Sequence, residues 1–105
     1  MECESVKTIK DCEEMATIDA YDEYEQTSGW YECLRGVFEE IDTVKIFGEK
    51  ISFQGIDFST DTDLVAVCKK NKKKVKITLD SIELIKPTKA QKLWLKAWCS
   101  WANYQ

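Results

Sequence analysis

The hydrophobic pattern changes its period twice along this chain of 105 residues, and this change constrains the fold more than any other feature. Between residues 24 and 41, apolar residues recur at spacings of three, four and seven, as on one face of a helix. From 43 to 79 they occur in short alternating or continuous runs that are typical of strands. Between 94 and 101 the helical spacing returns on a face that carries three tryptophans. The predicted order is therefore helix, strands, helix.

The middle of the chain predicts four short consecutive strands and leaves room for a fifth. The four runs span 43–47, 50–54, 64–68 and 74–79, and residues 82–85 can add the last one. Short consecutive strands of this kind form an antiparallel meander or a small barrel. We therefore expect an α+β fold, with a small antiparallel sheet or SH3-like barrel of four to five strands flanked by an N-terminal and a C-terminal helix.

Capping patterns mark where the two helices begin. Asp19 or Asp22 can cap the first helix, and Glu25 stands three residues after Asp22 in capping-box spacing. Thr88 and Gln91 repeat this spacing before the tryptophan-rich helix. The first 17 residues are polar, with scattered apolar positions, and predict an N-terminal arm or a short helix. Residues 18–105 are expected to form a single domain.

The composition argues against catalysis. The chain has no histidine, which removes most general acid–base machinery and every Cys-His nucleophile pair. No glycine-rich loop resembles a phosphate cradle, and the five cysteines form no C-x-x-C motif. No run approaches the ~20 apolar residues of a membrane span. We expect a non-enzymatic, monomeric, cytoplasmic protein that does not associate with membranes.

Charge is strongly segregated along the chain. Residues 1–42 carry 13 acidic and 3 basic side chains, whereas residues 69–105 carry 2 acidic and 10 basic ones. Mutual neutralisation across the fold is one interpretation of this pattern. The others are a cation site in the acidic part and an anion-binding surface in the basic part.

Two acidic clusters are candidate cation sites. Residues 57–63 are expected to form a loop of oxygen donors between two strands, with the carboxylates of Asp57, Asp61 and Asp63. Ca²⁺ binds such oxygens, but Thr62 and Cys68 stand at the sixth and twelfth loop positions, where an EF-hand has Gly and Glu. On this segment alone, a polar turn is the simpler interpretation. The second cluster surrounds the start of the first helix, where capping also explains it; it consists of Asp19, Asp22, Glu23 and Glu25.

A run of lysines occupies the turn between the last two long strands. Its members are Lys69, Lys70, Lys72, Lys73 and Lys74. These lysines are the candidate anion-binding residues of an alternative function, an SH3-like module that contacts nucleic acid or an acidic protein partner. No aromatic residue interleaves them and the whole chain is acidic, so nucleic acid is not favoured. Lysines that protect a strand edge are the simpler interpretation.

One segment resembles a known family. The residues Asp19-Ala20-Tyr21, Glu25, Gly29-Trp30-Tyr31 and Leu34 are similar to the opening signature of the CcbP-type bacterial calcium-binding proteins, D-A-Y-x-x-x-E-x-x-x-G-W-Y-x-x-L. A weaker likeness extends over most of residues 18–103 and includes the Trp98-x-x-Trp101 ending. Arg35 and Gly36 depart from the family pattern, which often has acidic residues there, so a carboxylate site that needs those positions is lost.

The resemblance implies a small protein that buffers or senses Ca²⁺ through surface carboxylates, without EF-hands. It makes the calcium interpretation of the two acidic clusters the preferred one. The aspartates of residues 57–63 are then expected to form one site, and the cluster at the helix start a second, weaker one. The sequence names no protein partner.

Overall fold

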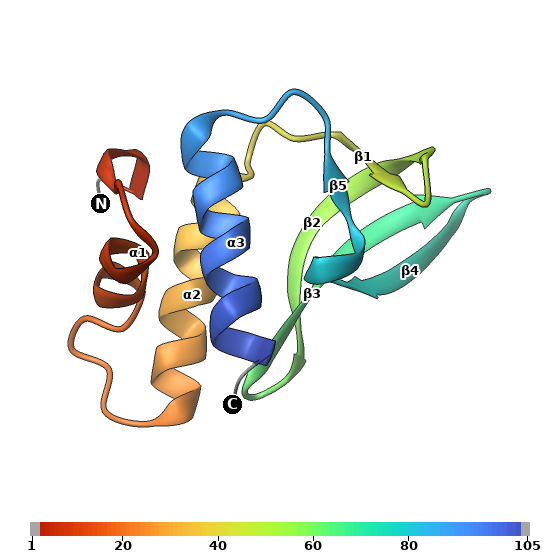
Figure 1. Ribbon diagram of the computed structural model, residues 1–105. Helices are drawn as coiled ribbons and strands as arrows, with labels where there is room; N and C mark the ends of the chain where they lie inside the picture. The colour runs from red at the N-terminus through yellow and green to blue at the C-terminus, as the bar shows by residue number, and fades with distance from the viewer. Residues whose placement is uncertain (1–2, 104–105) are drawn as a thin grey trace.

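A computed structural model describes residues 3–103 and places a layer of helices against an open antiparallel sheet (Figure 1). The helical elements are η1 (Cys3–Ser5), α1 (Ile9–Ala16), α2 (Glu23–Val37), η2 (Leu79–Ser81) and α3 (Lys89–Asn103). The strands are β1 (Thr43–Ile46), β2 (Glu49–Thr60), β3 (Asp63–Lys70), β4 (Lys73–Thr78) and β5 (Glu83–Leu84), in the spatial order β4-β3-β2-β1-β5. The α+β prediction is confirmed, and its antiparallel-sheet form is the one observed.

Local side-chain hydrogen bonds define where α2 begins. The carboxylate of Asp22 accepts a hydrogen bond from the Glu25 amide at 2.8 Å, so Asp22 rather than Asp19 is the cap. The buried face of α2 carries Trp30, Leu34 and Val37, whereas Tyr24, which the periodicity placed on that face, is 55% exposed. The helix ends at Val37, because the chain turns there toward β1.

The N-terminal segment packs on the helices. Thr8 and Asp11 form a reciprocal capping box at the start of α1. The side chains of Cys12 and Ala16 lie on the inner face of this helix and are buried. At the other end of the chain, Thr88 and Gln91 form the expected capping box of α3. The Trp94 indole Nε1 of α3 donates a 2.7 Å hydrogen bond to the Cys3 carbonyl. Helices α2 and α3 therefore lie between α1 and the sheet (Figure 1).

Four tryptophans form the centre of the helical layer. The ring of Trp30 lies 5.6–5.7 Å from those of Trp94, Trp98 and Trp101, measured between centroids. On the sheet side, Phe53 meets Phe38 edge to face at 6.2 Å. The core thus continues from the helices onto the inner face of the sheet. None of the helices in residues 3–103 has the length and apolar character needed to cross a bilayer.

Candidate functional site

The predicted loop over residues 57–63 is much shorter than expected. Strand β2 continues to Thr60 and β3 begins at Asp63, so only Asp61 and Thr62 remain in the turn. The strand continues because Phe58 packs on α2, with its ring centroid 5.1 Å from that of Tyr31. The expected loop of seven residues is therefore wrong in its extent.

This change separates Asp57 from the turn. Asp57 lies within β2 opposite Val65, and its carboxylate accepts a 2.8 Å hydrogen bond from the Phe58 amide. Its other oxygen lies 3.8 Å from the ammonium of Lys76 on β4. This carboxylate therefore faces a lysine, unlike Asp61 in the turn itself.

Asp63 lines a hollow at the end of the sheet, and Trp101 and Ala102 from the end of α3 line it as well. The hollow has a volume of about 400 Å³, and a second carboxylate, that of Asp80 from η2, also lines it. Thr62 and Thr78 contribute hydroxyl groups, and the end of α3 closes one side. A helix C-terminus presents unpaired carbonyl oxygens and a partial negative charge, and no basic side chain offsets this charge in the last turn of α3.

Nothing in the sequence pairs Asp80 with Asp63, because 17 positions separate them. Asp80 lies in η2, the short helical turn that joins β4 to β5. A carboxylate at a strand exit is a signal that sequence analysis can use, but only the fold shows which other acid it meets. Asp63, Asp80, Thr62 and Thr78 offer oxygen donors, which suit a hard cation such as Ca²⁺ or Mg²⁺, and Cys99 and two tryptophans line other parts of the hollow.

The acidic cluster at the start of α2 is divided by the structure. Asp19 and Glu25 line a shallow hollow of about 340 Å³ between α2 and the segment after α1. Ser28 and Glu32, on the next turns of α2, line it as well. Asp22 and Glu23 do not line this hollow; Asp22 is the helix cap, and Glu23 is an exposed residue of the first turn.

Neither hollow is a closed metal cage. Within residues 3–103, no three side chains of the His, Cys, Asp and Glu types lie close enough together to hold a metal ion. Glu32 is also engaged, because its carboxylate pairs with Arg35 at 2.7 Å. A cation in either hollow would need backbone oxygens, water or a shift of the carboxylates to complete its coordination shell.

The segregated charges form no direct ion pairs with each other across the described part of the fold. No ion pair in the described part of the chain joins an acid of residues 1–42 to a lysine of residues 69–105. Lysines of the β3–β4 turn lie at the opposite end of β3 from Asp63, a separation of roughly 23 Å for an extended strand of eight residues. The β3–β4 turn is therefore a basic end of the sheet, while in the helical layer α3 carries three further exposed lysines, Lys89, Lys92 and Lys96.

Four of the thiols, those of Cys12, Cys33, Cys68 and Cys99, are not activated nucleophiles. Burial raises the pKa of Cys12 and of Cys99 to about 11, and it also raises the pKa values of Cys33 and Cys68. These four side chains stay protonated at neutral pH, and a nucleophilic cysteine needs the opposite shift.

Two solved structures have the same fold as this chain. Anabaena CcbP superimposes with a TM-score of 0.73 and 18% sequence identity, over 93% of this chain and 94% of that one. A structure described as a calcium binding protein in the calcium-binding form gives a TM-score of 0.72 and 19% identity, over 98% and 95% of the two chains. A scan against protein-family models and a search of curated proteins found no match. The likeness in fold supports the CcbP-type resemblance carried by residues 19–34.

Proposed function

We propose that this protein is a non-enzymatic calcium-binding protein that buffers or senses Ca²⁺ through surface carboxylates. The observation that carries the proposal is the fold shared with Anabaena CcbP and with a second calcium-binding protein over at least 93% of the chain. The D-A-Y and G-W-Y segments at residues 19–31 agree with it, because they are similar to the signature of the same family. The carboxylates and hydroxyl groups that line the two hollows are ligands of the right chemical type.

The first proposed site lies at the β2–β3 turn and uses Asp61 and Asp63, with Asp80 from η2 as an added ligand. The helix C-terminus beside it contributes negative potential at no cost in side-chain entropy. Asp57, which the sequence grouped with this site, would join it only by leaving Lys76. We therefore assign Asp57 an auxiliary role.

The second, weaker site uses Asp19 and Glu25, with Glu32 from the next turns of α2. Glu23 contributes negative charge at its edge, and Asp22 would have to give up its capping bond to become a ligand. An Ncap bond typically contributes about 1 kcal/mol, so cation binding has to exceed that cost before Asp22 takes part.

We expect a Ca²⁺ affinity in the micromolar to millimolar range, because the proposed sites are open and partly hydrated. Ca²⁺ accepts irregular coordination by six to eight oxygens, whereas Mg²⁺ demands a near-ideal octahedron and retains its water. The proposed sites should therefore prefer Ca²⁺. Bound Ca²⁺ also stabilises the native state by mass action, by about 2.7 kcal/mol at a hundredfold excess over Kd.

Calorimetric titration of the metal-free protein tests this proposal. In ~0.1 M salt, which screens loose counterions, we expect saturable Ca²⁺ binding that Mg²⁺ does not reproduce. The double variant Asp61→Asn/Asp63→Asn should lose the tighter site, and Asp19→Asn/Glu25→Gln should lose only the weaker one.

The double variant Glu39→Gln/Glu40→Gln is the matched control, because it removes the same charge from exposed residues of the α2–β1 connection. It should bind Ca²⁺ as the wild type does. An equal response to Ca²⁺ and Mg²⁺ would contradict the proposed function. If the control and the Asp61/Asp63 variant lost the same Ca²⁺ affinity, then Ca²⁺ would be held by the overall negative charge of the surface and not by the proposed sites.

A further inference from the structure

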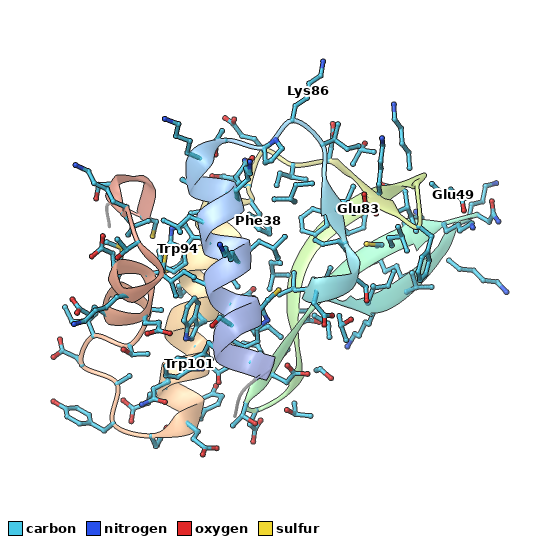
Figure 2. All side chains as sticks on the ribbon, viewed as in Figure 1. Phe38, Glu49, Glu83, Lys86, Trp94 and Trp101 are labelled. Carbon is cyan, nitrogen blue, oxygen red and sulfur yellow. The ribbon has the colours of Figure 1, made fainter. Side chains whose placement is uncertain are left out.

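Two hairpin turns lie beside each other at the end of the sheet farthest from α3 (Figure 1). The first is Phe47–Gly48, between β1 and β2, and the second is Asn71–Lys72, between β3 and β4. Glu49, labelled at this end in Figure 2, pairs with Lys70 at 3.0 Å and so joins the two hairpins. We call this region the hairpin-tip surface; it comprises Phe47, Glu49, Lys50, Lys69, Lys70, Lys72, Lys73 and Lys74.

The hairpin-tip surface concentrates positive charge at a cost to the fold. Its six lysines are all exposed, and Glu49 is the only carboxylate among its residues. Strand register places Lys69 opposite Lys74 and Lys70 opposite Lys73. Like charges directly opposite each other on neighbouring strands are destabilising, so this arrangement does not serve the stability of the sheet. An anionic partner would relieve the repulsion.

Phe47 adds a second unfavourable contribution to the stability of the fold, in the neighbouring hairpin turn. Its side chain is 98% exposed, and its backbone φ of 51° lies in the left-handed region. Asn and Gly are preferred at this position of a two-residue hairpin turn, because other residues are strained there. Asn71 fills the equivalent position of the neighbouring turn. Exposure and strain of an aromatic ring therefore coincide with the densest positive charge of the molecule.

We propose that the hairpin-tip surface binds single-stranded nucleic acid, with phosphates against the lysines and one base stacked on Phe47. Proteins that bind single strands without sequence preference combine a basic surface with an exposed aromatic ring, since every base has a face that can stack. Lysine ammonium groups act as point charges and suit phosphates in any register. An acidic peptide would satisfy the lysines but would leave the exposed ring of Phe47 unexplained.

The fold removes the two objections that the sequence raised. Phe47 lies 22 positions before the lysine run, and only the pairing of the hairpins brings the aromatic ring to it. The net charge of −4 also does not give a uniformly negative electrostatic potential over the surface. Asp63 lies roughly 23 Å from Lys70 along β3. That separation exceeds the ~8 Å Debye length at physiological ionic strength, so the carboxylate of Asp63 is screened from the hairpin-tip surface.

Fluorescence anisotropy with a labelled oligothymidylate of 15 nucleotides tests the proposal. EDTA is present throughout, which excludes bridging by a cation and separates this test from the calcium proposal. We expect saturable binding at low salt that weakens as salt rises. Phe47→Asn should bind roughly tenfold more weakly, because one stacked base is lost. The triple variant Lys72→Gln/Lys73→Gln/Lys74→Gln should reduce the slope of log K against log salt by about 2.

The two controls separate a specific surface from general charge. Lys89→Gln/Lys92→Gln/Lys96→Gln removes three exposed charges from α3 and should leave binding unchanged. Phe47→Asn should fold at least as stably as the wild type, since Asn tolerates the left-handed conformation and no buried contact is lost. Equal effects of the two lysine triples would overturn the proposal. So would tighter binding of labelled polyglutamate or of anionic phospholipid vesicles than of the oligonucleotide.

Discussion

Replacing Gly29 with alanine is expected to destabilise the native state by at least about 3 kcal/mol, the upper end of typical overpacking costs. A Cβ at position 29 would lie 1.7 Å from the carbonyl oxygen of Ala16 and 2.9 Å from its carbonyl carbon. Both are backbone atoms, so no side-chain rotation relieves the clash. Helix α1 would have to move away from α2 and expose Cys12 and Ala16. Urea denaturation followed by circular dichroism measures the loss.

Gly36 in the same helix is the matched control. It is exposed, and a Cβ added there meets no atom within 4 Å. Gly36→Ala should therefore stabilise the protein by roughly 0.5–1 kcal/mol, through the lower backbone entropy of the unfolded chain. Similar stabilities of the two variants would show that α1 does not approach α2 as closely as the structure indicates.

Trp30→Ala is expected to cost about 4 kcal/mol, within the range for removing a large aromatic side chain from a core. Trp30 is completely buried, and its ring contacts those of Trp94, Trp98 and Trp101. The cavity left by the indole would lie between α2 and α3, which limits how far the surroundings can collapse. Thermal unfolding and the near-ultraviolet circular dichroism of the remaining tryptophans report the change.

A conservative substitution separates packing from hydrogen bonding at this position. The Trp30 indole Nε1 is buried and has no hydrogen-bond partner within the part of the chain that the structure describes. Trp30→Phe removes this unpaired donor and retains an aromatic ring, so it should cost far less than the alanine variant. If both variants cost the same, then the unpaired donor and the ring contacts do not explain the stability at this position.

These two positions show what the G-W-Y segment does in this fold. Gly29 permits the close approach of α1, Trp30 fills the tryptophan cluster, and Tyr31 packs on Phe58 of β2. Each contributes to packing, and none offers a carboxylate. The segment is therefore a signature of the architecture, and calcium chemistry has to be tested at the acidic residues around it.

Local interactions made much of the architecture predictable. The Asp22 and Thr88 caps are bonds between residues three positions apart, and both are read directly from spacing. Alternation over residues 43–47 and 74–79 located β1 and β4, although in β4 only Ile77 is half-buried and Val75 is exposed. Capping bonds and alternation of apolar residues each involve only residues close together in the sequence, so both can be recognised without knowledge of the fold.

Contacts between distant residues decided the rest. Strand β2 continues through the predicted loop because Phe58 packs on Tyr31, 27 positions earlier in the chain. The fold also places Asp80 on the same hollow as Asp63 and joins the hairpin of Phe47 to the lysine run through Glu49 and Lys70. The sequence by itself determined the helices, most of the strand positions and the segregation of charge, because these follow from local bonding and periodicity. Only the tertiary structure decided which acids share a hollow and which hairpin turn lies beside the lysine run, because such neighbours depend on how strands pair and helices pack.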